Sequence, residues 1–185
     1  KVCYPFGYGL SYTCFTMTDI KACEDGERIK VSLKVTNTGT YAGKEVVQVY
    51  ISAPQGLLQK PAKELKAFAK TKLLQPGEVQ ELELTFTKAS MASYDDLGKV
   101  AKSAYVLEAG EYAIYIGTNA RDVVKTDWSY IVSENQVIEQ LSAKLVPTQL
   151  KKRILADGTY EELPLGEPND PNACIFEKMR PGTDE

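Results

Sequence analysis

Hydrophobic and polar residues alternate along the first half of the chain with the period of a β-strand. Between residues 29 and 36 every second position is apolar, and the positions between are lysine, serine or threonine. This pattern is typical of a strand with one face in a core and the other in water. Residues 46–51 are apolar almost throughout, which predicts a strand in the interior of a sheet. Residues 79–87 alternate again.

Turn signals separate these segments from further short strands. Asp-Gly lies within residues 24–27, Asn37 begins the next turn, and Pro-Gly lies within residues 75–78. The remaining expected strands are residues 15–23, 104–107, 112–117 and 128–132. About seven strands at roughly 8–12-residue spacing predict an all-β fold, an antiparallel immunoglobulin-like or fibronectin type III-like β-sandwich with an irregular C-terminal extension.

Two segments are ambiguous by pattern alone. Residues 63–74 suit a helix by composition, but the flanking strands and prolines favour an extended chain there. Residues 88–96 predict a short helical turn. Lysines recur from Lys60 to Lys72, either as a patch that attracts anions or, as we prefer, as a solvated face or charged strand edge.

The character of the chain changes after residue 133. Residues 137–146 suit one more strand or a short helix, and prolines then punctuate a polar, acidic segment. Asp157-Gly158 predicts a hairpin between residues 150–155 and 160–165. We therefore expect a hinge or linker at 1–14, a sandwich domain at 15–146 and a C-terminal linker or arm at 147–185.

Composition excludes several classes of function. Of 185 residues, 43% are hydrophobic and 25% are charged, which suffices for a core without disulfides or metal. The net charge is −3 without a basic stripe, so we expect no nucleic-acid partner. No apolar run approaches the ~20 residues that a bilayer span needs, so we expect no membrane partner. The chain begins without Met, which indicates a domain fragment and leaves the compartment unassigned.

The four cysteines, Cys3, Cys14, Cys23 and Cys174, form no Cys-x-x-Cys pair, and the chain has no histidine. A zinc site would need all four thiolates from irregular spacing. We therefore expect neither a metal nor a cofactor, and we interpret the cysteines as buried free thiols, with disulfides left open.

Residues 4–13 hold four aromatic residues, two glycines and one proline. Such density is unusual near a chain end, because termini are usually polar and mobile. Glycines favour close backbone contact, whereas a sugar-binding platform needs rigid exposed rings. We therefore interpret the aromatic residues as interdomain-packing candidates, ahead of a sugar platform or an internal core. They are Tyr4, Phe6, Tyr8 and Tyr12.

This stretch and six later ones resemble the fibronectin type III-like domain of family 3 glycoside hydrolases, the β-glucosidase and β-xylosidase group. The resemblance runs from about residue 4 to residue 132, and the linked series is more specific than any one part. The matching segments are Pro5–Thr13, Val49–Pro54, Lys60–Phe68, Leu74–Glu78, Ala92–Asp95, Glu108–Tyr112 and Gly117–Asp122.

The resemblance implies a parent enzyme with two further domains as partners of this one. A (β/α)8 barrel supplies the nucleophilic Asp in that family, and an α/β sandwich domain supplies or positions the acid/base Glu. Some members are permuted, with the barrel after the fibronectin-like domain, and residues 147–185 would suit a connector in that order.

Catalytic residues are not expected in this chain. Thr126-Asp127-Trp128 superficially resembles the family's nucleophile motif, but it falls in an expected sandwich strand, where Trp128 suits the core. Glycosidases need two carboxylates with one pKa raised, and adjacent carboxylates on a strand point to opposite faces. Without histidine there is no Ser-His or Cys-His relay. The candidate pairs are Asp95 with Asp96, Glu81 with Glu83, and Glu161 with Glu162.

We therefore expect a non-catalytic accessory or scaffold domain that packs against the catalytic domains of a β-glucosidase-type enzyme. The alternatives are a carbohydrate-binding module with its own affinity and an immunoglobulin-like adhesion module. The sugar specificity of the parent enzyme and its domain order are not determined by this sequence.

Overall fold

The structure is a computed structural model that describes residues 2–142, 150–155 and 157–163. These residues form two compact units, residues 2–92 with 107–135, and residues 93–106 with the described residues after 135. The first unit contains β1 (Phe15–Asp25), β2 (Arg28–Asn37), β3 (Val46–Ser52), β4 (Glu64–Lys70), β5 (Val79–Thr87), the 3₁₀ turn η1 (Lys88–Met91), β8 (Gly110–Gly117) and β9 (Val123–Val132).

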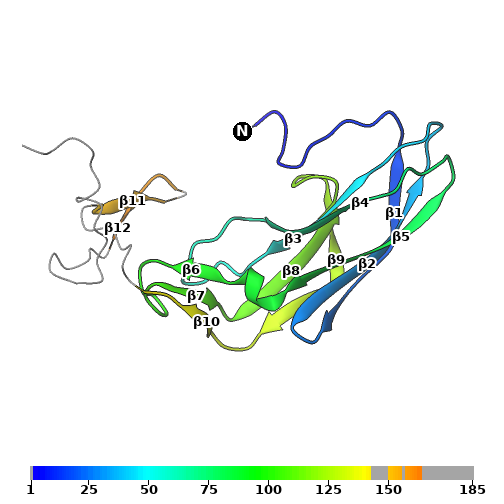
Figure 1. The fold of residues 1–185 in the computed structure, drawn as a ribbon. Coiled ribbons are helices and arrows are strands. Elements are labelled where there is room, and N and C mark those ends of the chain that lie inside the picture. The colour runs from blue at the N-terminus through cyan, green and yellow to red at the C-terminus, as the bar shows by residue number, and fades with distance from the viewer. Residues whose placement is uncertain (1, 143–149, 156, 164–185) are drawn as a thin grey trace, which may run out of the picture. The chain divides into compact units, whose positions relative to one another are not determined.

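Two antiparallel sheets face each other in the first unit (Figure 1). One sheet has the order β1-β2-β5, and the other has the order β4-β3-β8-β9. The expected all-β sandwich is therefore confirmed. The apolar segment 46–51 lies as β3 in the interior of its sheet, as predicted, and the ambiguous segment 63–74 contains a strand, β4, rather than a helix.

The core lies between the two sheets and is filled by their inward-facing side chains. The alternating apolar residues of β2 are at most 3% exposed. They pack with residues from the facing sheet, and the partly buried Trp128 packs against this core. The main buried contributors are Ile29, Val31, Leu33, Val35, Val47, Val49, Ile51, Leu84, Phe86, Tyr112, Ile114 and Ile116.

A β-bulge in β1 changes which positions face this core. The register against β2 shifts between Thr18 and Lys21, and Asp19 has a φ of 53° within the bulge. The inward positions therefore change from Phe15 and Met17 before the bulge to even-numbered residues after it. Because of this shift, β1 shows no clean period-2 pattern in the sequence.

The second unit contains β6 (Ser93–Asp95), β7 (Ala104–Leu107), β10 (Gln136–Gln140) and the hairpin β11 (Lys152–Ile154) with β12 (Tyr160–Glu162). The expected strand 104–107 exists, but it pairs in a separate sheet of order β10-β7-β6 instead of joining the sandwich. None of the described residues forms a helix long and apolar enough to cross a membrane. The domain bounds expected from the sequence stay predictions.

Three segments differ in detail from the sequence-based expectation. β9 begins at Val123, five residues before the expected start at Trp128, because its mostly exposed first half also pairs with β8. The expected segment 137–146 is a strand at Gln136–Gln140, and its last residues lie outside the described part. The hairpin predicted around Asp157-Gly158 is present as β11 and β12.

Two lysine side chains of the Lys60–Lys72 segment are buried, contrary to the expected solvated face. The Lys66 side chain, paired with Glu64, is 6% exposed, and Lys60 is more deeply buried. The Lys60 and Glu108 side chains form an ion pair and are only 1% and 3% exposed. Lys60 also donates to the Pro54 carbonyl at 2.8 Å. Glu108 accepts from the backbone amides of Leu57 and Leu58. This pair orders the loop between β3 and β4, and each charged group has hydrogen-bond partners, as burial requires.

Replacing Lys60 by methionine should destabilise the sandwich by about 3–5 kcal/mol, because it leaves the Glu108 carboxylate buried without its cation. The measurement is urea unfolding followed by the fluorescence of Trp128, the single tryptophan of the chain. The matched control is Lys125→Met, which removes an exposed pair with Glu111 and should change stability by less than about 1 kcal/mol. Equal effects of the two variants would contradict the structural role of the buried pair.

Candidate functional site

The four interdomain-packing candidates lie in an irregular segment, residues 2–14, that precedes β1 and is called the strap below. Tyr4 and Phe6 are 69% and 67% exposed, Tyr8 is 44% exposed and Tyr12 is 98% exposed. Leu10 between them is also exposed. The rings of Tyr4 and Tyr8 lie 4.9 Å apart at a tilt of 39°. The structure thus leaves large apolar side chains of the strap exposed to solvent, with two of the rings in contact.

Hydrogen bonds from the sandwich hold the backbone of the strap in place. The amide of Ala120 donates to the Phe6 carbonyl at 2.9 Å, and the Gln48 side chain donates to the Gly7 carbonyl at 3.1 Å. At the other end, the amide of Thr38 donates to the Cys14 carbonyl at 2.9 Å. The strap is therefore attached through its main chain, while most of its aromatic side chains project into solvent.

Gln48 is the central residue of this attachment. Its side chain lies on the outer face of the four-stranded sheet, yet the residue is only 5% exposed. It donates to the Gly7 and Thr118 carbonyls and accepts a hydrogen bond from the Tyr50 hydroxyl. Burial raises the pKa of Tyr50 above its ordinary value, so the phenol stays protonated and remains a donor.

Gly7 can approach Gln48 because it has no side chain. Its φ is +80°, a conformation that L-residues rarely adopt, and a Cβ there would lie 2.1 Å from the Gln48 Oε1 atom. Gly9, by contrast, has nothing within 4 Å of its Cβ position. The two glycines of the strap therefore differ: Gly7 permits a close contact, and Gly9 does not need to be glycine for space.

The loop after β8 presents the Ala120 amide to the strap. The Asn119 side chain is buried, and its Oδ1 accepts from the amides of Arg121 and Asp122 at 2.9 Å each. Its Nδ2 donates to the Asp122 carboxylate at 2.8 Å. This internal network makes the loop a shaped support, which explains why the polar run after Gly117 is not a free loop.

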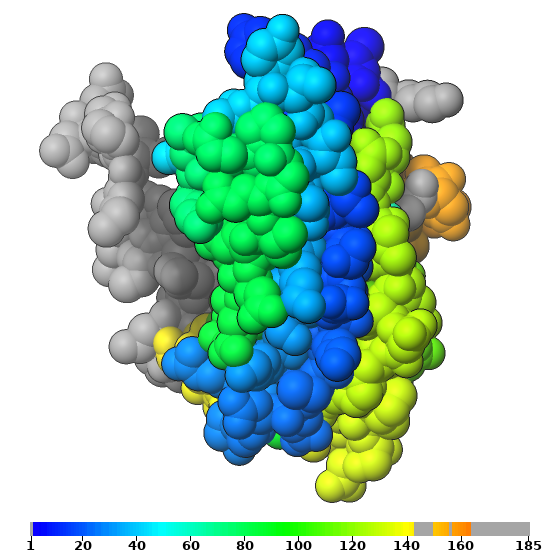
Figure 2. Space-filling model, turned by 90° about the vertical axis from the view of Figure 1, so that its right-hand side faces the viewer, coloured from blue at the N-terminus to red at the C-terminus, as the bar shows by residue number. Residues whose placement is uncertain are grey.

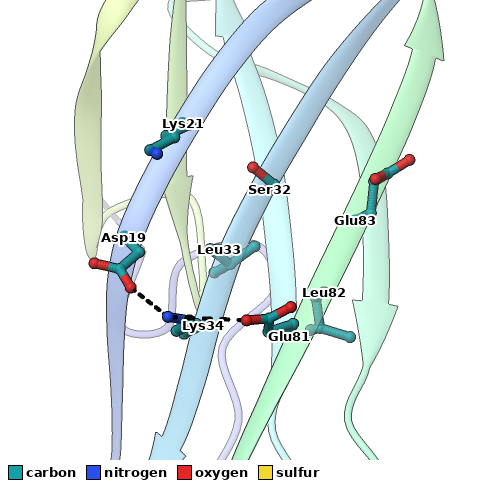
Figure 3. Close-up of a pocket in the computed structure, with 8 residues that line it drawn as sticks. All are labelled: Asp19, Lys21, Ser32, Leu33, Lys34, Glu81, Leu82 and Glu83. Atoms are coloured by element: carbon teal, nitrogen blue, oxygen red, sulfur yellow. Dashed lines mark ion pairs between the residues drawn. The ribbon is translucent and has the colours of Figure 1, made fainter.

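The outer face of the three-stranded sheet β1-β2-β5 is charged, unlike the aromatic surface of the strap. Figure 2 views this face, with β5 in green, β2 in light blue and β1 in blue side by side. A shallow hollow of about 510 Å³ on it is lined mostly by charged groups, and Lys34 pairs there with Asp19 at 2.9 Å and Glu81 at 3.8 Å (Figure 3). The residues that line the hollow include no aromatic side chain, so this face of the sheet is compatible with exposure to water.

The paired carboxylates considered from the sequence all have hydrogen-bond or ion-pair partners. Four backbone amides, at residues 98–101, donate to the fully buried Asp95. Burial acts to raise the pKa of Asp95, but these four hydrogen bonds outweigh it and lower the pKa. Hydrogen bonding to Lys99 lowers the pKa of Glu161, with a smaller effect from Arg153.

The other members of these pairs form ion pairs with basic side chains. Asp96 pairs with Arg153 at 2.9 Å, Glu83 with Lys30 at 2.6 Å, and Glu162 with Lys152 at 3.1 Å. None of the resolved pKa shifts among the candidate carboxylates is upward. The described residues also contain no group of three or more metal-binding side chains. Each carboxylate of the candidate pairs therefore has a basic or backbone partner within the described part of the chain.

The structure also bears on the Asp127-Trp128 motif and on the cysteines. Asp127 lies exposed in β9 and Trp128 packs against the core, as the sandwich-strand interpretation predicts. The expectation of buried thiols is wrong for Cys3, Cys14 and Cys23, which are all exposed. The first two belong to the irregular strap, and Cys23 lies near the end of the edge strand β1, so nothing covers them within this unit. Cys174 lies outside the described residues.

Sequence reasoning missed Gln48 and Phe68. Gln48 lies in an apolar run, where a single amide gives no signal of the segment that covers it. Phe68 alternates with alanines in β4 and looks like a core residue, but it is 69% exposed. It lies directly opposite Gln48 in the register of β3 and β4.

Gly7→Ala should release the strap, because the added Cβ meets Gln48 and the positive φ becomes strained by about 1–3 kcal/mol. The measurement is the rate of chymotrypsin cleavage after the strap's aromatic residues, which should rise roughly tenfold. Gly9→Ala is the matched control and should leave the rate unchanged. If the two variants are cleaved equally fast, the contact with Gln48 does not hold the strap.

Asp95→Asn should destabilise the loop at residues 96–102 by about 1–3 kcal/mol, because the amide replaces only part of the carboxylate's acceptors. Since the folded pKa lies below the ordinary value of 3.8, the contribution of Asp95 is full above that value and is lost as pH falls through the folded pKa. In the wild-type protein the amide resonances of residues 98–101 should titrate together below pH 3.8. Asp96→Asn should keep this titration, and its persistence in Asp95→Asn would contradict the assignment.

Comparison with known proteins places this arrangement in a family. The profile of the fibronectin type III-like domain matches residues 45–120. The chain is 53% identical to β-glucosidase A of Butyrivibrio fibrisolvens over 97% of its own length and 24% of that protein. It is 43% identical to a β-glucosidase of Ruminococcus albus over 90% of its length and 18% of that protein.

Solved structures agree with these sequence matches. A β-glucosidase from Paenibacillus barengoltzii aligns with a TM-score of 0.77 and 45% identity, over 90% of this chain and 20% of that one. β-Glucosidase 3B from Thermotoga neapolitana aligns with a TM-score of 0.66 and 43% identity, over 74% and 18%. The chain thus spans a quarter or less of the length of these relatives, and it belongs to the fibronectin type III-like domains of the family 3 glycoside hydrolases.

Proposed function

We propose that this chain is a non-catalytic accessory domain of a family 3 β-glucosidase, and that its strap packs against the catalytic domains of the parent polypeptide. The observation that carries the proposal is the way the strap is held. Its main chain is hydrogen-bonded to the sandwich at Phe6, Gly7 and Cys14, while its aromatic side chains stay in solvent. Such fixed and exposed rings are suited to fill pockets on a neighbouring surface.

The relatives support the identity of that surface. They are β-glucosidases whose length is at least about four times the part that this chain matches. The partners proposed here are therefore the (β/α)8 barrel and the α/β sandwich domain that the family resemblance implies. Because the parent is proposed as a β-glucosidase, hydrolysis of O-glycosyl bonds would take place on those domains.

A non-catalytic role is supported by the state of the carboxylates. Those of the candidate pairs form ion pairs or accept backbone hydrogen bonds, and neither resolved shift raises a pKa. A glycosidase acid needs the opposite environment, an apolar site that keeps the carboxyl protonated near neutral pH. The chain alone should therefore hydrolyse no aryl β-glucoside, and turnover that is lost on mutation of one of its Asp residues would overturn this part of the proposal.

Replacing the four aromatic residues of the strap by serine should lower the melting temperature of the full-length polypeptide by several degrees, on the order of 2–4 °C for each kcal/mol of lost packing. Hydrolysis of an aryl β-glucoside near that temperature should fall with it. Ile131→Ser is the control, because Ile131 is 65% exposed on β9, away from the strap's contacts. A melting temperature equal to that of the control would contradict strap packing.

Titration of the chain with cello-oligosaccharides separates this proposal from a carbohydrate-binding module. Saturable binding tighter than millimolar, lost in the serine variant, would assign the aromatic residues to sugar stacking instead of domain packing. The expected result is no saturable change in tyrosine or Trp128 fluorescence.

A further inference from the structure

The outer face of the four-stranded sheet is apolar next to β4, unlike the charged outer face of the other sheet. Tyr50 lies opposite Leu65 on one side and Tyr115 on the other, so the three side chains share this face. Tyr50 is 1% exposed, and Leu65 and Tyr115 are half-buried. Phe68 belongs to the same face and is 69% exposed.

Phe68 lies next to the place where the strap crosses this face. It is directly opposite Gln48 across β3 and β4, and Gln48 is hydrogen-bonded to the Gly7 carbonyl at 3.1 Å. Directly opposite residues on an antiparallel pair have Cβ atoms about 4.5–5.5 Å apart. Phe68 therefore adds an exposed aromatic side chain to the sheet, beside the residue to which the strap is attached.

The cations around this area are of two kinds. Lys125, opposite Tyr115, pairs with Glu111, and Lys66 on β4 pairs with Glu64, whereas three others have no carboxylate partner among the described residues. Lys63 lies 5.3 Å from the ring centroid of Tyr115 and donates to the Ala120 carbonyl, and Arg121 donates to the Val2 carbonyl. Lys70 lies opposite Val46 on the same face. Among the residues that the structure describes, none of these three forms an ion pair, whereas Lys30 and Lys34 on the charged face both do.

An apolar patch with an unpaired basic rim is complementary to an apolar patch with an acidic rim. We propose that Phe68 anchors a second row of contacts, which lies next to the strap on the other side of Gln48. These contacts are made with the part of the parent polypeptide outside this chain, through an apolar patch that has acidic side chains at its edge. The inference rests on the proposed function. That part is the candidate occupant because the relatives extend over at least about three quarters of their length beyond the matched region.

The test uses two pairs of variants in the full-length polypeptide. Phe68→Ser is matched by Ile131→Ser, an equally exposed apolar residue on the other edge strand of the same sheet. Lys70→Glu is matched by Lys21→Glu, a charge reversal on the opposite outer face. The second pair leaves every apolar side chain in place, so it tests the surface even if Phe68→Ser folds poorly.

The readout is hydrogen exchange of the β4 amides, with the melting temperature measured in parallel. Phe68→Ser and Lys70→Glu should each speed exchange about tenfold and lower the melting temperature, and the two controls should stay within about twofold of the wild type. If Phe68→Ser behaves like its control, Phe68 does not anchor a contact. If Lys70→Glu behaves like its control, the partner surface has no acidic rim facing Lys70.

The strap variant with four serines, measured alongside, separates this inference from the proposed function. If that variant is destabilised while Phe68→Ser and Lys70→Glu are not, the second row fails and strap packing stands. If none of the three is destabilised, both fail.

Carbodiimide cross-linking identifies the occupant, since it joins lysine amines directly to neighbouring carboxylates. Lys70 should link to an Asp or Glu outside residues 1–185. A link to the acidic residues after 164, or one that depends on protein concentration, would assign the surface to this chain's own C-terminal segment or to a second copy and would overturn the proposal.

Discussion

The sandwich depends on the exclusion of water from the layer between its two sheets. The side chains of β2 on one sheet and of β3 and β8 on the other meet there almost without exposure. Burial of that apolar area is the main favourable term available to a chain without metal-binding clusters in its described part. Because each strand alternates, the same arrangement produces two outer faces, and the character of those faces is what distinguishes this domain.

The outer faces of the two sheets have different surroundings: one is exposed to water, and the other is partly covered by the strap. On the β1-β2-β5 face, lysines and carboxylates alternate across strands and pair with each other, an arrangement that is stable in water and offers little to a partner (Figure 3). On the β4-β3-β8-β9 face, the strap contacts the buried Gln48, which accepts a hydrogen bond from the buried Tyr50. A side-chain amide on the outer face of a sheet is ordinarily hydrated. The Gln48 amide donates instead to the Gly7 carbonyl of the strap and to the Thr118 carbonyl of the loop after β8.

Polar groups buried elsewhere shape the loops. Lys60 and Glu108 are removed from water together and hold the connection between β3 and β4 through backbone amides and carbonyls. Asp95 does the same for the loop that precedes β7, with four amide donors around one carboxylate. Such groups are costly to bury unless every partner is present, so each of them specifies one loop conformation. Both carboxylates thus have a structural role in holding a loop.

The sequence alone determined the strands whose burial is regular and the presence of the aromatic strap. Alternation in residues 29–36 predicted β2, continuous apolarity predicted the interior position of β3, and Asp157-Gly158 predicted the last hairpin, since each depends on local pattern only. The tertiary structure decided what depends on neighbours distant in the chain: the bulge at Asp19, the buried Lys60, the exposed cysteines and the sheet to which β7 belongs. It also decided that Phe68 points outward opposite Gln48, because which face of a strand is covered is set by the packing of the whole sandwich and is not encoded in the strand's own residues.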